Sequence, residues 1–265
     1  MIFLMKKGGL RFGIVTLFLL GLGSCAMTGY RTQDLSQGSP TPIRLVQISD
    51  LHLKRKDALY DAVLQRVQDL KPDLLVLTGD MVEKAADLPL LKEFLTKLNP
   101  QYPAFAILGN WEYKAGVNHQ ELRELLKDRG VELLINQDVQ LQIHDRWVYL
   151  AGVDDYLGGA PDFQFIKSIP ERKEVVRLIL AHCPILFDLW NQGEHEDPFT
   201  MLSGHTHGGQ ITFFGVSLVT PPGSGSYVKG LYTQGNQRLY VSSGVGTSTI
   251  DLRVFMDPVV DLILF

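Results

Sequence analysis

Two histidines, His205 and His207, stand two residues apart in a glycine-rich segment, residues 204–209 (GHTHGG). On a loop that leaves a strand, this spacing lets both imidazole rings turn toward one point, and glycine lets the backbone come close to an ion. The pair therefore favours a metal site. A surface loop that carries two histidines by chance is the alternative, and ligands elsewhere in the chain would disfavour it.

Five apolar segments of the sequence are each followed by side chains that can bind a metal. They cover residues 43–49, 74–77, 104–108, 175–181 and 199–203, and their composition is typical of buried strands. A strand-end Asp or Asn is commonly a turn former, but five such sets in a row are not expected by chance. Because ligands of open α/β sheets bind outside the carboxyl ends of the strands, these side chains are expected to converge in one crevice. They are Asp50, His52, Asp80, Asn110, His182, His205 and His207.

This set of oxygen and nitrogen donors is too large for one zinc ion and suits two metal ions that share a carboxylate. Asp80 is the natural shared ligand, because a carboxylate offers two acceptor oxygens. Asn110 is neutral, which keeps the site from becoming too negative to admit a phosphate. The donor mix fits two divalent ions of Mn, Fe, Zn or Co and does not choose among them.

Helical segments separate the first three strands. Apolar residues recur at helical spacing over residues 57–70 and 88–98, and Asn118 with Glu121 forms a capping box for a helix that runs to about Asp128. After Gly130 strands dominate, which predicts a second sheet. The further expected elements are strands over residues 131–135, 139–143, 147–153, 239–243 and 259–265 and a short helix over residues 186–192.

The order of the ligand residues resembles a known family. The motifs Asp-x-His, Gly-Asp, Gly-Asn-x-Glu, a lone His and Gly-His-Thr-His, between residue 43 and the C-terminus, resemble those of the calcineurin-like metallophosphoesterase superfamily. Residues 152–155, 203–211 and 241–247 are similar to an exported or membrane-associated branch that includes UDP-2,3-diacylglucosamine pyrophosphatases. The resemblance implies the metallo-dependent phosphatase fold, a four-layer αββα sandwich of two mixed sheets in the α+β or α/β class.

The resemblance also implies how the ligands divide between two metals, with Asp80 as the bridge. One metal would be held by Asp50, His52 and His207, and the other by Asn110, His182 and His205.

Two divalent ions roughly 3.5–4 Å apart lower the pKa of a bridging water, bind two phosphoryl oxygens and neutralise charge as phosphorus becomes five-coordinate. The expected reaction is therefore hydrolysis of a phosphate ester by attack of the metal-bridging hydroxide, without a covalent enzyme intermediate. We expect Asp80 and Asn110 to act in catalysis, and we expect Glu112 to contribute by orienting a ligand histidine.

Trp111 departs from the family pattern, because most relatives in this family have histidine at that position. An indole donates one N–H but does not release a proton near neutral pH. General-acid catalysis contributes a factor of about 10²–10⁴ and matters most for poor leaving groups. We therefore expect Trp111 to contact a phosphodiester or pyrophosphate with a good leaving group, and we expect weak action on alkyl monoesters. Whether His119 replaces the missing histidine, or is an exposed residue at a helix start, stays open.

Three other residues carry smaller hypotheses. Asp154, beside Asp155, either contacts substrate or forms a turn. Arg253 either binds phosphate with both guanidinium N–H pairs or is a surface arginine. Cys183 follows an apolar strand, so a small buried residue is expected there rather than a nucleophile.

The first 24 residues are typical of a lipoprotein signal peptide. Lys6, Lys7 and Arg11 precede a short apolar run, and residues 22–25 (LGSC) end in Cys25, the expected lipidated residue. An uncleaved anchor helix is the alternative. Either interpretation places the rest of the chain outside the cytoplasm, at the periplasmic or extracellular face of a bacterial membrane. Residues 25–42 are polar and predict a flexible tether, so the catalytic domain is expected over residues 43–265.

Charge excludes one class of partner. The chain has 25 Lys and Arg against 29 Asp and Glu, and the signal segment takes away three cations and no acids, which leaves a formal charge of −7. No basic stripe is present, so we expect no nucleic-acid polymer as a partner, and we expect a monomer. The favoured hypothesis is a membrane-tethered hydrolase of a lipid- or nucleotide-linked phosphate ester. The alternatives are an exported phosphodiesterase that scavenges nucleotides or glycerophosphodiesters and a metal-binding scaffold lipoprotein.

Overall fold

The protein is described by a computed structural model that covers residues 29–166, 175–191, 197–209, 212–213, 216–217, 220–248 and 257–265. Three of the sequence predictions fall outside these residues: the signal segment 1–24, lipidation of Cys25 and phosphate binding by Arg253. Among the described residues, none of the helices combines the length and the apolar character needed to cross a membrane.

The first sheet has six strands in the order β1-β14-β2-β3-β4-β5. β2, β3, β4 and β5 are parallel, whereas β14 runs antiparallel to β2 and β1 runs parallel to β14. Successive residues of β3 face opposite sides, so Leu75 and Leu77 pack toward the helices and Leu74 and Val76 pack toward the second sheet. The strands are β1 (Gly29–Asp34), β2 (Arg44–Ile48), β3 (Leu74–Thr78), β4 (Ala104–Ile107), β5 (Glu132–Leu133) and β14 (Val259–Leu264).

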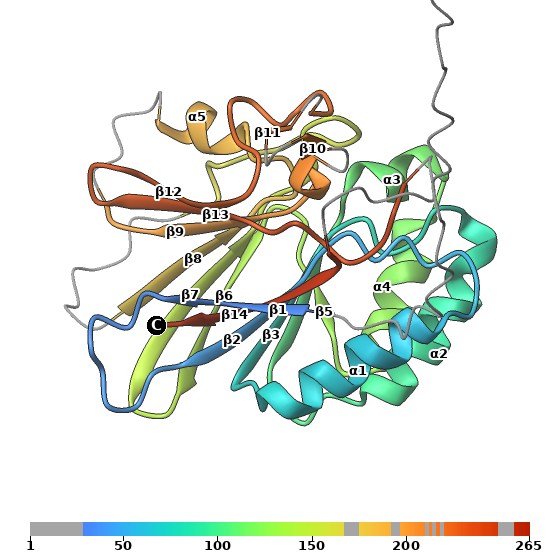
Figure 1. Ribbon diagram of the computed structural model, residues 1–265, viewed down its shortest axis with the longest axis horizontal. Helices are drawn as coiled ribbons and strands as arrows, with labels where there is room; N and C mark the ends of the chain where they lie inside the picture. The colour runs from blue at the N-terminus through green and yellow to red at the C-terminus, as the bar shows by residue number, and fades with distance from the viewer. Residues whose placement is uncertain are drawn as a thin grey trace, which may run out of the picture.

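Helices α1 (Ala58–Leu70), α2 (Leu88–Leu98) and α4 (His119–Lys127) cover the outer face of this sheet (Figure 1). The Asp57 side chain caps α1 by accepting a hydrogen bond from the backbone N–H of Leu59, and Asn118 caps α4 in the same way. All three helices lie where the sequence predicted them. A 3₁₀ turn, Ala85–Asp87, precedes α2, and the short helix α3 (Asn110–Lys114), which was not predicted, follows β4.

The second sheet also has six strands, in the order β12-β13-β9-β8-β7-β6. β7, β8, β9 and β13 are mutually parallel, and the edge strands β6 and β12 pair antiparallel with their neighbours. Helix α5 (Leu186–Asn191) lies on its outer face, and β10 (Thr212–Phe213) pairs with β11 (Val216–Ser217) in a separate hairpin. The strands are β6 (Gln137–Ile143), β7 (Arg146–Gly152), β8 (Val175–Leu180), β9 (Thr200–Ser203), β12 (Gly230–Gln234) and β13 (Gln237–Val241).

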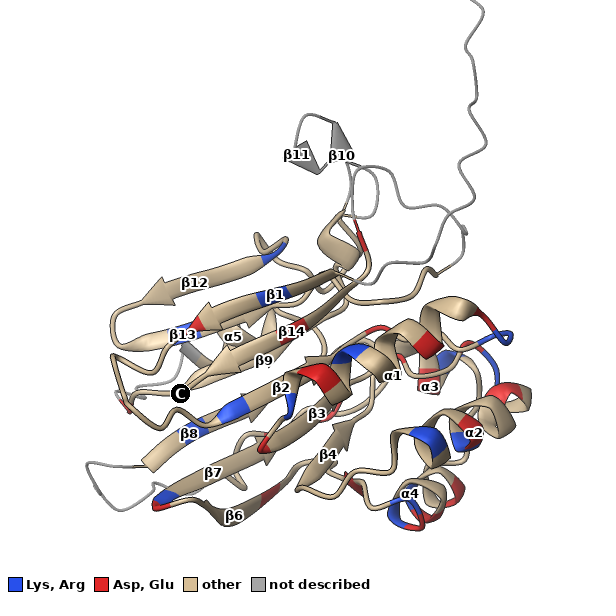
Figure 2. Ribbon diagram, turned by 60° about the horizontal axis from the view of Figure 1, so that its bottom comes forward, with Lys and Arg blue, Asp and Glu red and all other residues tan. Residues whose placement is uncertain are grey.

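Three apolar layers hold these elements together. One lies between the helices and the first sheet, the second between the two sheets, and the third between the second sheet and α5. The predicted four-layer αββα sandwich of two mixed sheets is therefore confirmed. Figure 2 shows that charged residues gather on α1, α2 and α4, as expected for amphipathic helices with one face in water.

The prediction of a flexible tether over residues 25–42 is wrong for residues 29–34. These residues form β1, which hydrogen-bonds along its length with β14, from Gly29 opposite Val259 to Asp34 opposite Leu264. The strand lies at the sheet edge, and none of its residues is fully buried. Because an edge strand with no buried residue can be polar throughout, its sequence does not differ from that of a linker. The folded domain thus includes residue 29 and does not begin at residue 43.

Candidate metal centre

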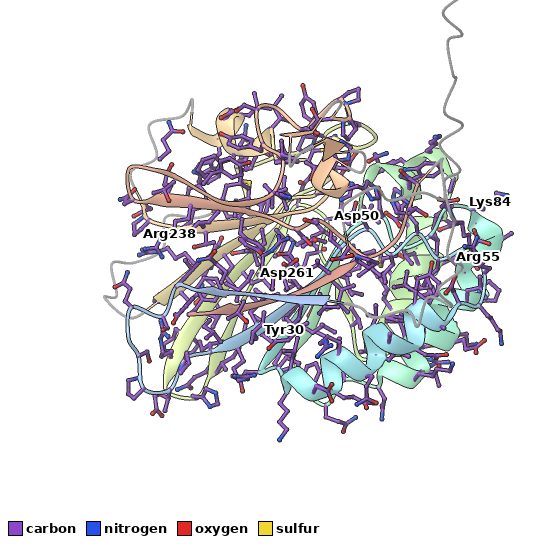
Figure 3. The ribbon with its side chains drawn as sticks, viewed as in Figure 1. Tyr30, Asp50, Arg55, Lys84, Arg238 and Asp261 are labelled. Carbon is purple, nitrogen blue, oxygen red and sulfur yellow. The ribbon has the colours of Figure 1, made fainter. Side chains whose placement is uncertain are left out.

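The predicted ligands converge at one end of the molecule. Each follows the carboxyl end of a strand, from β2, β3 and β4 in the first sheet and from β8 and β9 in the second. We call this end of the sandwich, with the loops that follow these strands, the ligand end. Six of the seven predicted ligands are buried, and Asn110, the first residue of α3, is partly exposed. Figure 3 shows Asp50 inside the molecule, whereas Arg55 and Lys84 lie on its outside near α2.

Asp50, His52 and His207 form the first candidate metal-binding group. Each contributes one ligand atom that lies within 4.8 Å of the others. The two imidazole Nε2 atoms of His52 and His207 are 3.2 Å apart, and Nε2 of His207 is 3.8 Å from Oδ1 of Asp50. The structure therefore brings together the three residues that the resemblance assigned to one metal.

Asp80, His182 and His205 form the second candidate group, with ligand atoms again within 4.8 Å of one another. Oδ1 of Asn110 joins them, at 3.2 Å from Nε2 of His182 and 3.0 Å from Nδ1 of His205. Asp80 stands between the two groups, because its Oδ2 is 3.2 Å from Nε2 of His182 and 3.5 Å from Nε2 of His52. This is the position that a bridging carboxylate requires.

Backbone carbonyls fix the protons on two of the imidazoles. Nδ1 of His182 is 2.8 Å from the carbonyl oxygen of Thr78, and Nε2 of His205 is 2.6 Å from the carbonyl oxygen of Pro222. A carbonyl only accepts hydrogen bonds, so each of these ring nitrogens carries a proton. The opposite nitrogens, 3.2 Å apart, face the cluster beside the Asn110 oxygen. Such a set of converging lone pairs fits a divalent cation.

Burial keeps His52 neutral. The ring is fully buried, and this burial outweighs the nearby Asp80 carboxylate and lowers the pKa of His52 to about 3. A neutral imidazole is the form that binds a metal. The residues present therefore fit two divalent cations, in groups that share Asp80.

His182 makes cation binding dependent on pH. Burial lowers the pKa of His182, but the charge of Asp80 and its hydrogen bond outweigh burial and leave the pKa well above 6.5. A proton on Nε2 therefore competes with a cation at neutral pH. We expect Mn²⁺ binding to release protons and its affinity to rise with pH until the pKa of His182 is reached. Calorimetric titration in buffers of different ionisation enthalpy measures this release, and a proton count of zero at neutral pH would contradict the prediction.

The backbone is strained at five of the seven predicted ligands. Their φ angles lie in the left-handed region: 52° at Asp50, 44° at His52, 53° at Asp80, 72° at His205 and 50° at His207. Residues other than glycine rarely adopt this conformation, and such strain concentrates at functional sites. These angles turn the side chains of successive loops inward at the point where each strand ends.

Gly204 lets the loop after β9 approach the loop after β2. A Cβ atom at this position would overlap Oγ of Ser49 and would lie 2.6 Å from Oδ2 of Asp50. We expect Gly204→Ala to lower the free energy of unfolding by about 1–3 kcal/mol through overpacking, and to weaken Mn²⁺ binding by displacing Asp50. Urea titration and Mn²⁺ binding measure the two effects.

Gly29→Ala is the matched control for this substitution, because its nearest neighbour, the carbonyl oxygen of Pro258, would lie 3.5 Å from the added Cβ. It should leave stability and Mn²⁺ affinity close to those of the parent protein. Equal effects of the two substitutions would show that close packing at Gly204 is not required.

Glu112 occupies a different place from the one predicted. Its buried carboxylate accepts hydrogen bonds from the backbone N–H groups of Gly109 at 2.8 Å, Asp80 at 3.0 Å and Met81 at 2.7 Å. It therefore ties the loop after β3 to the loop after β4, and the expectation that it orients a ligand histidine is wrong. Glu112 is a positioning residue for Asp80. Its partners are backbone groups, which leave no signature in a sequence.

Trp111 lies beside the first group. Its ring meets the His52 ring edge-on, with centroids 5.5 Å apart, and its backbone N–H donates to Oδ1 of Asp80 at 2.8 Å. The ammonium group of Lys114 lies 3.7 Å from the Trp111 ring centroid. His119 packs against Tyr113, with ring centroids 4.5 Å apart. This packing does not favour the hypothesis that His119 replaces the missing histidine.

Asp154 forms a turn, so its predicted role in substrate binding is not supported. Its Oδ1 accepts hydrogen bonds from the hydroxyl of Tyr113 at 2.5 Å and from the backbone of Asp155 at 2.8 Å, and its Oδ2 accepts from the backbone of Ala160 at 2.9 Å. These local donors satisfy both oxygens. Cys183 is buried, as predicted, and burial raises the pKa of its thiol far above the usual range.

Comparison with known proteins matches residues 43–225 to the family described as calcineurin-like phosphoesterase. An uncharacterised metallophosphoesterase of Campylobacter jejuni is 34% identical over 228 residues, which cover 80% of this chain but only 56% of the relative. The phosphodiesterase YaeI of Escherichia coli is 30% identical over 233 residues, which cover 84% of this chain and 82% of the relative. A 5′-nucleotidase precursor of Thermus thermophilus shares the fold, with a TM-score of 0.52 at 13% identity over 85% of this chain and 55% of that one.

Proposed function

The chain belongs to the calcineurin-like phosphoesterase family, as a metal-dependent phosphoesterase, and we propose that it hydrolyses phosphodiesters or pyrophosphates at the outer face of a bacterial membrane. The observation that carries the proposal is the convergence of two metal-binding groups on the shared carboxylate of Asp80. The name of the relative YaeI, a phosphodiesterase, supports the choice of bond.

The two groups of donor atoms that lie close together in the structure would each hold one divalent cation. One cation would be held by Asp50, His52 and His207, the other by Asn110, His182 and His205, with Asp80 shared. Such cations supply an activated water and neutralise charge on the phosphoryl oxygens. The chain itself orients the donors through Glu112 and through the carbonyls of Thr78 and Pro222.

Trp111 supports a preference for good leaving groups. Its ring lies against His52, at the side of the first group, where the family pattern has a histidine. An indole N–H donates a hydrogen bond to a departing oxygen but keeps its proton. Lys114 adds positive charge beside the ring. Leaving groups that depart as stable anions, such as a nitrophenolate or a phosphate monoester, are therefore favoured.

The membrane part of the proposal depends on the leader. A basic segment, a short apolar run and residues 22–25 (LGSC) support lipidation at Cys25 and export of the domain. The phosphate esters available to the enzyme are then those outside the cytoplasm, either lipid-linked or nucleotide-linked.

Hydrolysis of bis(p-nitrophenyl) phosphate and p-nitrophenyl phosphate by the full chain with Mn²⁺ tests the reaction. We expect kcat/KM for the diester to exceed that for the monoester by at least about tenfold, because the proposed substrate is a diester and both compounds release the same nitrophenolate, so the ratio reports the class of phosphate ester alone. A monoester rate equal to or above the diester rate would contradict the choice of bond while keeping the phosphoesterase. Absence of turnover with Mn²⁺, Fe²⁺, Zn²⁺ and Co²⁺ would favour the scaffold hypothesis.

A further inference from the structure

The direction of β1 places the start of the folded domain at the ligand end. β1 is parallel to β14, and β14 is antiparallel to β2, so Gly29 lies at the same end of the first sheet as the carboxyl end of β2. Figure 1 shows β1 and β14 running side by side. The backbone N–H of Val259, opposite Gly29, donates to the carbonyl of Gly244 at 3.1 Å. A Cβ on Gly244 would lie 2.7 Å from Oδ2 of Asp50, so this corner of the fold adjoins the first metal-binding group.

The chain between Cys25 and Gly29 is short. Three residues, Ala26, Met27 and Thr28, separate them. Even fully extended, these four steps span only about 14 Å. Because β1 is part of the sheet and not part of a tether, an acyl chain on Cys25 would hold the ligand end close to the bilayer surface.

Exposed apolar side chains lie at the same end. Tyr156 and Leu157, 38% and 45% exposed, follow the carboxyl end of β7. Their loop packs on α3, because a Cβ on Gly158 would lie 2.5 Å from the side chain of Tyr113. α3 also carries Trp111, which contacts His52. Lys114, also on α3, lies against the Trp111 ring. Aromatic and apolar side chains beside a lysine are favoured at the boundary between lipid and water.

We infer that the ligand end is the membrane-facing surface of this protein and that its substrates are phosphodiesters carried by lipids of the same bilayer. The inference rests on the proposed lipidation of Cys25 and deepens the proposed function. In the reaction, water adds across one P–O ester bond of the headgroup, and the products are a phosphomonoester, the alcohol or phenol released from that bond, and a proton.

Orientation is tested without catalysis by one fluorophore placed at either end of the molecule. Cys183 is buried and an acylated Cys25 has no free thiol, so a cysteine introduced on the surface is the reactive one in the lipidated full chain. Leu157→Cys reports the ligand end. Trp147→Cys is the matched control, because Trp147 is 41% exposed and is the second residue of β7, at the opposite end of the strand that precedes Leu157.

The two labelled proteins are reconstituted in vesicles of phosphatidylethanolamine and phosphatidylglycerol that contain a lipid with a nitroxide headgroup. We expect several-fold stronger quenching at position 157 than at position 147. Equal quenching, or stronger quenching at position 147, would overturn the orientation. A full chain that is recovered without acylation would overturn the anchoring and this inference together.

The substrate class is tested with hexadecyl p-nitrophenyl phosphate in the same vesicles, beside soluble bis(p-nitrophenyl) phosphate. A Gly/Ser insertion of about 20 residues before Gly29, with a root-mean-square reach of about 25 Å, releases the ligand end from the bilayer. We expect the insertion to lower turnover of the vesicle-borne diester several-fold and to leave turnover of the soluble diester unchanged. Unchanged turnover of both substrates would overturn the membrane-facing inference. If the parent chain does not hydrolyse the soluble diester at all, the proposed function is contradicted instead.

Discussion

Asp80→Asn will lower kcat/KM for bis(p-nitrophenyl) phosphate by more than about 100-fold, because removing an outer partner of a metal ligand already costs 10–100-fold and Asp80 stands between both groups. Asparagine preserves the size of the side chain and an oxygen that accepts the Trp111 N–H bond, so the change isolates the loss of charge. The measurement is steady-state hydrolysis at saturating Mn²⁺, together with the number of Mn²⁺ ions bound.

Asp69→Asn serves as the control for this substitution. Asp69 is exposed on α1, and its Oδ1 accepts a hydrogen bond from Gln65 of the same helix at 2.9 Å. We expect parental activity from this variant. If Asp80→Asn keeps folded circular dichroism and activity within tenfold of the parent, a bridging role for Asp80 is excluded.

Trp111→His will broaden the range of leaving groups. A histidine beside His52 supplies a proton donor near neutral pH, so turnover of a diester with an alkoxide leaving group, such as glycerophosphocholine, should rise by at least about tenfold relative to bis(p-nitrophenyl) phosphate. The gain should fall above the pKa of the new imidazole, because only the protonated ring donates. The pH profile of kcat/KM for both substrates measures this.

Trp111→Phe separates acid catalysis from a change in packing. Phenylalanine keeps an aromatic ring against His52 but has no proton to donate. Its ratio of alkoxide to nitrophenolate turnover should not rise above the parental value. A Phe variant that gains as much as the His variant would show that the bulk of Trp111, and not its chemistry, limits the substrate range.

The ligand set was predictable from sequence because each member follows an apolar strand directly. Asp80 after Leu74–Thr78 and His182 after Val175–Leu180 are recognisable from the strand alone, and parallel strands bring their carboxyl ends together. The helices were predictable for a related reason, since the caps Asp57 and Asn118 and the apolar spacing act within a few residues of each other.

The parts that could not be predicted depend on contacts distant in sequence. The carbonyl of Thr78 fixes the proton of His182 across 104 residues, and any residue type would offer the same carbonyl. Glu112 was noticed but misassigned, because its partners are backbone N–H groups. The β1 strand was missed because its pairing with β14, at the far end of the chain, leaves polar residues facing water on an edge.

Both candidate groups draw donors from the two sheets. Asp50 and His52 come from the first sheet and His207 from the second, so a cation bound there would join positions 155 residues apart in the chain. Such a cross-link lowers the conformational entropy of the unfolded chain, which stabilises the folded state by on the order of 5 kcal/mol. The cations would then cross-link the two sheets reversibly, and the free energy of unfolding would rise with the concentration of free metal.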